Sequence, residues 1–194
     1  MRKRFAIIFL VFIYSFQESN YRILDFGQFK ITVPKNWNKF NEKGLDSYIG
    51  GIITDTKDTL KFDLGRHSQD LIKSDFPMVY DARRLAELTV KELEMLPDTK
   101  HLIVDSTTRD INYHEYLQYQ FENDSISCFK AKFITPRNKK FGGSGIYIDS
   151  LKGSDKMHYK ISFNFYGWYL DEKTQDKFFK ALKTLQFKED CENN

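Results

Sequence analysis

The chain has few cysteines, only two in 194 residues. Two cysteines cannot form the dense disulfide framework that replaces a hydrophobic core in small secreted domains. A single bridge between Cys128 and Cys191 remains open in an oxidising compartment. Cys191, however, lies in a polar C-terminal stretch typical of a frayed end, whereas Cys128 falls in an expected strand. The pattern therefore favours two free thiols, with Cys128 buried.

A surplus of charge of one sign is also missing. The chain carries 30 Lys and Arg against 27 Asp and Glu. Much of that difference comes from Arg2, Lys3 and Arg4, so beyond residue 19 the counts are 27 and 26 and the net charge falls to +1. A nucleic-acid-binding domain requires a one-sided basic surface. The near-neutral charge therefore argues against a nucleic-acid partner.

Long hydrophobic runs are scarce as well, with one from Phe5 to Phe16. It follows three cations and spans about 12 residues, which is typical of a secretory signal peptide and short of the roughly 20 residues that cross a membrane. No cysteine follows the run, so the sequence gives no support for lipid attachment. We therefore expect residues 1–19 to be a signal peptide, the protein to be exported to the periplasm or the extracellular space, and the mature chain to contain no transmembrane segment.

Aromatic residues are plentiful at 16% of the chain, and they supply much of the expected core. The stretch from Gly27 to Trp37 is the point from which we expect the fold to be organised. Its alternation of apolar and polar residues predicts a strand with one buried face, and Pro34 ends the strand because it has no N–H to donate. Trp37 then packs back over the sheet. We expect residues 20–26 to be a polar lead-in, residues 27–187 to form a single domain and residues 188–194 to be a frayed tail.

The rest of the chain predicts strands separated by turns, with two helices. Strands are expected at 47–54, 60–64, 102–105, 129–136, 146–149 and 158–166, and amphipathic helices at 82–96, capped by Asp81, and at 171–185. Residues 110–123 fit either a helix or a strand, and we favour a strand from Tyr116 onward. Residues 38–44 are expected to form a polar turn, and Gly142–Gly145 a flexible hairpin loop.

The order of these elements, together with two short motifs, resembles the PsbP-like superfamily. The motifs are Val33-Pro34-Lys35-Asn36-Trp37 near the start of the domain and the Phe178 to Phe187 segment at its end. This group includes the extrinsic photosystem protein, a Ran-binding nuclear import factor and exported bacterial proteins of unknown role. The resemblance implies an α+β fold with an antiparallel sheet of six to seven strands flanked by helices, an α/β/α sandwich, and a function in binding. No Ran-binding or photosystem-specific motif is matched.

Two groups of side chains form the candidate binding site. Arg137, Lys139 and Lys140 lie in a basic turn, which fits contact with an anionic group. Tyr166, Trp168 and Tyr169 lie at or just after the end of the last expected strand. Together with Trp37 from elsewhere in the chain, they fit an aromatic platform for a sugar or a peptide. The alternatives are a merely solvated turn and rings that close the core.

The sequence predicts no catalytic residue, cofactor or metal. Asp63, His67 and Asp70 have the residue types of a metal or acid–base site, but their spacing matches no ligand motif, and an enzyme would need the imidazole within hydrogen-bonding reach of either carboxylate. We therefore expect an exported, non-enzymatic domain that binds a protein or another envelope component. The alternative is a small-ligand carrier, which requires an enclosed pocket lined by Phe and Tyr.

Overall fold

The structure is a computed structural model that describes residues 20–73, 75–76, 79–94, 102–103, 116–137, 142–152 and 160–188. The expected signal peptide at 1–19 and most of the expected tail lie outside these residues. Lys139, Lys140 and Cys191 also lie outside them.

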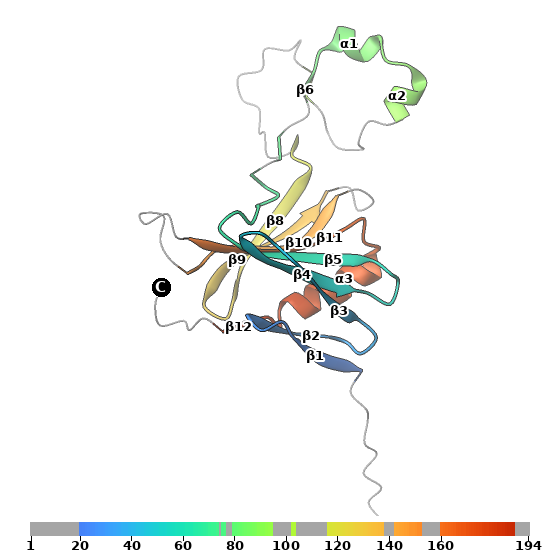
Figure 1. Ribbon diagram of the computed structural model, residues 1–194. Coiled ribbons are helices and arrows are strands. Elements are labelled where there is room, and N and C mark those ends of the chain that lie inside the picture. The colour runs from blue at the N-terminus through green and yellow to red at the C-terminus, as the bar shows by residue number, and fades with distance from the viewer. Residues whose placement is uncertain are drawn as a thin grey trace, which may run out of the picture.

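About half of the described residues belong to two antiparallel sheets (Figure 1). The larger sheet contains β3 (Asn38–Glu42), β4 (Ser47–Ile53), β5 (Thr59–Gly65), β8 (Tyr119–Ile126), β9 (Phe129–Pro136), β10 (Gly143–Lys152) and β11 (Ile161–Trp168). Its spatial order is β3-β4-β5-β11-β10-β9-β8. The smaller sheet contains β1 (Tyr21–Asp25), β2 (Phe29–Pro34) and β12 (Gln186–Phe187), and β6 (Val79–Tyr80) pairs in parallel with β7 (Leu102–Ile103). The prediction of an α+β fold with a sheet of six to seven strands is confirmed.

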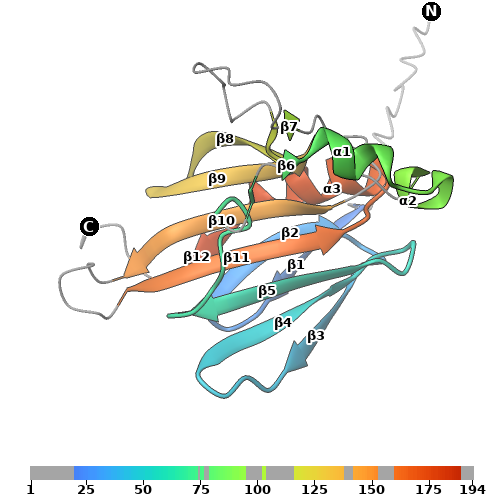
Figure 2. The same cartoon turned by 90° about the horizontal axis from the view of Figure 1, so that it is seen from above.

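The layers are unequal on the two faces of the large sheet. Helix α3 (Glu172–Leu182) and the three-stranded sheet cover one face, with α3 packed against β2 and β10 (Figures 1 and 2). Helices α1 (Ala82–Ala86) and α2 (Val90–Glu94) bury no residue, and Figure 1 draws them beyond the other face. None of the described helices is long and apolar enough to cross a membrane.

Phenylalanine rings fill the space between the large sheet and its covered face. Phe29 of β2 lies with its ring centroid 4.9 Å from that of Phe62 and 5.1 Å from that of Phe163. Phe165 approaches Phe178 of α3 to 5.2 Å in the same edge-to-face manner. Each of these five side chains is at most 1% exposed. Aromatic pairs in this geometry stabilise the fold beyond the area that they bury.

Trp37 is completely buried in this core, which confirms its predicted role as an anchor. Its indole N–H donates to Oδ1 of Asp55 at 2.9 Å, in the loop between β4 and β5. Lys177 of α3 donates to the other carboxylate oxygen of Asp55 at 3.0 Å. Asp55 therefore connects the anchor, the hairpin loop and the helix.

Two segments that the sequence predicted as irregular are strands. Residues 20–26, predicted as a lead-in, contain β1, which pairs with β2 along its whole length and buries Leu24. Residues 38–44, predicted as a polar turn, contain β3, whose side chains are mostly exposed and so show no alternation. Pairing with β4 stabilises β3, because Gly51 leaves the space that the ring of Phe40 occupies.

The helix predicted at 82–96 is two short helices among the described residues. Asp81 caps α1 as predicted, because its carboxylate accepts the N–H of Arg83 at 2.8 Å. The break follows from a second cap at Thr89. The N–H and hydroxyl of Thr89 donate to the carboxylate of Glu92 at 2.8 and 2.7 Å, a capping box that starts a new helix at α2.

Two local predictions in the second half of the chain are wrong. Gly143 and Gly145 are buried inside β10 and not in a flexible loop, and a Cβ on Gly145 would lie 1.9 Å from the carbonyl oxygen of Phe165. Cys128 lies in the two-residue turn between β8 and β9 and not in a strand, next to Ser127 with its positive φ of 56°. Cys128 is also exposed and disulfide-bonded, so the expectation of a buried free thiol there is wrong.

The contacts of Asp55 predict a pH-dependent contribution to stability. The hydrogen bond from Lys177, followed by that from Trp37, lowers the pKa of Asp55 to about 2. Because the folded-state pKa is depressed, the stabilisation is complete above the unfolded-state pKa near 4 and is lost as the pH falls from there toward 2. We expect Asp55→Asn to lower the free energy of unfolding at pH 7 by about 1–2 kcal/mol, as for a lost hydrogen bond to a charged group. Urea denaturation between pH 7 and pH 2 should show this difference shrinking below pH 4, and a constant difference would contradict it.

The disulfide of Cys128 predicts sensitivity to reductants. The chain has one other cysteine, so we expect peptide mapping of the unreduced monomer to recover Cys128 crosslinked to Cys191. Closing a loop of about 60 residues is expected to contribute roughly 2–4 kcal/mol, which urea denaturation with and without reductant measures. Two free thiols in the denatured, unreduced protein would contradict this prediction.

Candidate functional site

The predicted aromatic residues and Arg137 lie at one end of the seven-stranded sheet. Trp168, at the end of β11, pairs with Gly143 at the start of β10. Arg137 directly follows β9, the neighbour of β10 on the other side, and its N–H donates to the carbonyl of Gln118 at 2.8 Å. The structure thus brings these two parts of the predicted site to the same end of the sheet.

Tyr169 has an unusual backbone conformation at this end of the sheet. Its φ is 56°, in the left-handed region that favours glycine. Its N–H donates to the carbonyl of Gly142 at 3.0 Å, which fixes the turn. A non-glycine residue in this region costs about 1–2 kcal/mol. The residue is nevertheless 67% exposed, so burial of its side chain does little to offset that cost.

Trp168 presents part of its ring to solvent beside Tyr169. The indole is 49% exposed, and the two ring centroids lie 6.4 Å apart at an angle of 50°. Gly143 leaves room behind the indole, because a Cβ there would approach it to 3.4 Å and the side chain of Leu71 to 3.0 Å. The alternative that these rings close the core is right for Trp37 and Tyr166, which are both buried. It is only partly right for Trp168 and wrong for Tyr169.

The structure adds a third exposed ring that the sequence did not indicate. Phe76 is 72% exposed and follows Asp75, whose carboxylate accepts the N–H groups of Gln118 and Tyr119 at 3.0 and 2.8 Å. This contact places Phe76 near the start of β8, at the same end of the sheet. We call Phe76, Trp168 and Tyr169 the aromatic end.

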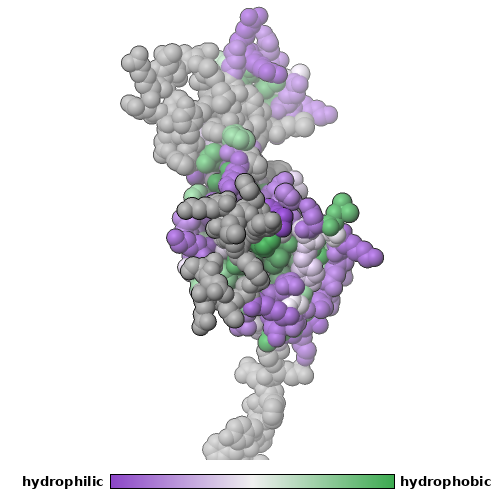
Figure 3. Space-filling view, turned by 60° about the vertical axis from the view of Figure 1, so that its left-hand side comes forward, coloured by the Kyte–Doolittle hydropathy of each residue, from purple (hydrophilic) through white to green (hydrophobic). Residues whose placement is uncertain are grey.

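On the face shown in Figure 3, hydrophobic residues gather in the middle of the described surface and hydrophilic residues surround them.

A buried ion pair holds the segment that leads to Phe76 against the sheet. The side chain of Asp70 is fully buried, and its Oδ2 accepts a hydrogen bond from Nζ of Lys132 on β9 at 2.7 Å. Leu71 and Ile72 pack beside it on a small apolar cluster of the outer face, made by Tyr119, Ile134, Tyr147 and Tyr166. Removing one partner of such a pair leaves a buried charge uncompensated. The ion pair therefore positions this side of the aromatic end.

The tyrosines of that cluster stay protonated. Burial, followed by a hydrogen bond to Asp149, raises the pKa of Tyr147 to about 12. Its hydroxyl donates to Oδ1 of Asp149 at 3.0 Å. Burial also raises the pKa of Tyr166. These hydroxyls can donate hydrogen bonds but are poor bases at neutral pH.

The candidate metal or acid–base group does not assemble. Nε2 of His67 lies 3.6 Å from Oδ2 of Asp46, and both side chains are well exposed. Asp70 is committed to Lys132, and no hydrogen bond joins His67 to Asp63 or Asp70 among the described residues. Within the part of the chain that the structure describes, no three His, Cys, Asp or Glu side chains lie close enough together to hold a metal ion.

Comparison with known proteins gives no family for this chain. No protein-family model matches it, and no curated protein is significantly similar to it. The resemblance to the PsbP-like superfamily therefore stays a prediction.

The backbone of Tyr169 predicts an unusual response to substitution. Tyr169→Gly removes the strain of about 1–2 kcal/mol but adds flexibility to the unfolded chain that costs about 0.5–1 kcal/mol. We expect the free energy of unfolding to stay the same or to rise by up to about 1.5 kcal/mol, measured by urea denaturation. Tyr169→Ala, which removes the ring and keeps the strain, is the control and should not be more stable than wild type. Destabilisation by Tyr169→Gly of more than about 1 kcal/mol would mean that the ring serves folding.

Proposed function

We propose that this protein is a non-enzymatic binding module whose aromatic end contacts a protein partner. The observation that carries the proposal is the exposed ring of Tyr169 on a strained backbone, beside Trp168. Strained backbone conformations concentrate at functional sites, where the surrounding structure maintains them. Exposed Trp and Tyr rings are the side chains that most often anchor protein interfaces.

The chemistry around the rings suggests the kind of partner. Arg137 lies at the same end of the sheet, and Lys139 and Lys140 follow it in the sequence. A partner surface that combines an apolar anchor with acidic groups would complement this end of the sheet. The signal peptide predicted from the sequence favours a partner in the cell envelope or outside the cell.

A small-ligand carrier is the less supported alternative. The inner-face phenylalanines contact one another, as the pairs of Phe29, Phe62 and Phe163 illustrate. The grooves at the surface of the described residues carry mixed side chains, and the groove beside β8 has Gln120, Glu122 and Thr135 in its lining. An aromatic pocket with few polar groups would fit a carrier better.

The proposal is tested by a pull-down from an envelope extract with residues 20–194 as bait. The test variant combines Trp168→Ser with Tyr169→Gly, which removes both rings and relieves the strain. The control is Tyr21→Ser, which removes a ring that is 54% exposed on the small sheet. We expect a specific partner to be retained by wild type and control and reduced at least tenfold in the double variant.

A second bait tests the basic turn separately, with Arg137, Lys139 and Lys140 all replaced by Ala. Loss of the same partner would extend the site to this turn. Equal retention by wild type and the Trp168 and Tyr169 double variant, or no specific partner at all, would overturn the proposal and favour a ligand carrier.

A further inference from the structure

The two edges of the seven-stranded sheet differ in how they are covered. At one edge, β3 is tied to the small sheet by side chains. Nζ of Lys39 donates to the carbonyl of Asp25 at 2.8 Å, and the guanidinium of Arg22 donates to Oδ1 of Asn38 at 2.7 Å and to the carbonyl of Trp37. These contacts connect the β3 edge to β1 of the small sheet.

The other edge, β8, is long and regular. It pairs with β9 over eight residues without a register shift, and residues 120–125 are exposed. It contains no proline or bulge, two devices that commonly protect sheet edges from further pairing. The only charged residues on this strand are Glu122 and Asp124.

Two backbone positions of β8 have no partner toward the edge among the residues that the structure describes. The N–H groups of Tyr119 and Ser125 already donate to carboxylates, to Oδ2 of Asp75 and to Oδ1 of Asp124, both at 2.8 Å. In an antiparallel ladder every second residue directs its N–H and C=O away from the paired strand. Phe121 and Asn123 share this orientation with Tyr119 and Ser125. Outside the β8–β9 ladder, no hydrogen bond among the described residues involves their backbone groups.

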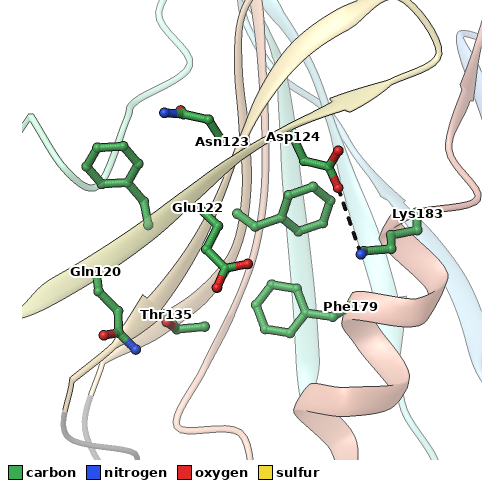
Figure 4. A pocket seen from close by; sticks show the side chains of 9 residues that line it. Gln120, Glu122, Asn123, Asp124, Thr135, Phe179 and Lys183 are labelled. Carbon is green, nitrogen blue, oxygen red and sulfur yellow. Dashed lines mark ion pairs between the residues drawn. The ribbon is translucent and has the colours of Figure 1, made fainter.

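A groove runs beside this edge, between β8, β9 and α3 (Figure 4). Its volume is about 460 Å³. Phe133 and Phe179, with ring centroids 5.9 Å apart, supply its apolar part. Asp124 is paired with Lys183 at 3.8 Å, whereas Glu122 makes no ion pair with another described residue. The uncompensated charge in the groove is therefore negative.

We propose that the β8 edge binds an extended, basic protein segment as an eighth strand of the sheet. Phe121 and Asn123 supply backbone hydrogen bonds, and alternate side chains of the bound segment point into the groove, as in other cases of strand addition. A Lys or Arg there packs its aliphatic stem on Phe133 and Phe179 and pairs its charge with Glu122. This surface goes beyond the function proposed above, because it shares no residue with the aromatic end.

The charges also determine which face of the bound segment is basic. On the outer face, Nζ of Lys132 lies 5.6 Å from the ring centroid of Phe121, but its charge is paired with the carboxylate of Asp70. The side chains of the segment that point outward meet the ring of Phe121 and should therefore be apolar, whereas those that point into the groove should be basic.

A second copy of the chain fits this edge poorly. The antiparallel register that uses both open positions places Phe121 of one copy opposite Asn123 of the other. The same register sets the two Glu122 side chains directly opposite each other, and like charges in that position are destabilising. The edge is therefore better matched to a basic segment of a different protein.

The test is a binding measurement with two synthetic peptides. Fluorescein-labelled Thr-Lys-Val-Lys-Val-Lys-Thr is titrated with residues 20–194 and followed by fluorescence anisotropy, and its counterpart with Glu in place of Lys is treated in the same way. We expect wild type to bind the Lys peptide at least tenfold more tightly than the Glu peptide. No detectable preference would overturn the proposal.

Two variants separate strand addition from general attraction between charges. Asn123→Pro keeps every charge but removes an outward N–H, so it should weaken binding of the Lys peptide at least tenfold. Glu122→Lys should reverse the preference of the edge in favour of the Glu peptide. If circular dichroism shows that Asn123→Pro is unfolded, Glu122→Lys alone tests the proposal. Glu94→Lys on α2 is the matched charge control and should leave the preference unchanged. Retained binding by a folded Asn123→Pro variant, or an unchanged preference in Glu122→Lys, would overturn the proposal.

Discussion

The packing of Phe29 against Phe62 and Phe163 is the contact on which the rest of this structure depends. It joins the small sheet to the centre of the large one, so that β1, β2 and β12 cover the large sheet together with α3. With that face filled by rings, recognition is left to the outer face, the strand ends and the edges. Both surfaces proposed here for binding lie in such places, at one end of the strands and along β8.

Polar interactions position both surfaces. Such interactions are weak where water can replace one partner, and they are stronger where the partners are buried. Asp70 is the main example, because its buried carboxylate is held by the side chain of Lys132 and by the backbone N–H of Ile72. That pairing holds the segment before Phe76 on the sheet. Asp75 then connects the same segment to the start of β8. One loop thereby links the aromatic end to the strand that forms the open edge.

The sequence predicted the buried half of the fold better than the exposed half. The β2 strand, the Trp37 anchor and the Asp171 cap of α3 follow from alternation, a buried ring and a capping side chain. Strand β3 left no such signal, because its formation depends on the glycines of β4. The same holds for the candidate site. Trp168 and Tyr169 could be predicted because they are large aromatic residues just after an expected strand, whereas the positions of Phe76 and the β8 edge depend on tertiary contacts. The left-handed conformation of Tyr169 has no signature in sequence at all.

The disulfide of Cys128 adds an oxidation step to the maturation of the protein. The bond is attached to the turn that closes the β8–β9 hairpin, so the strand with the open edge is the one that carries a covalent restraint. The phenylalanine core needs only water to form, but the crosslink needs an oxidant. Formation of the core and formation of the disulfide are therefore chemically separable events. A molecule that has completed the first but not the second would be a distinct maturation intermediate, with its core formed and its edge hairpin not yet tethered.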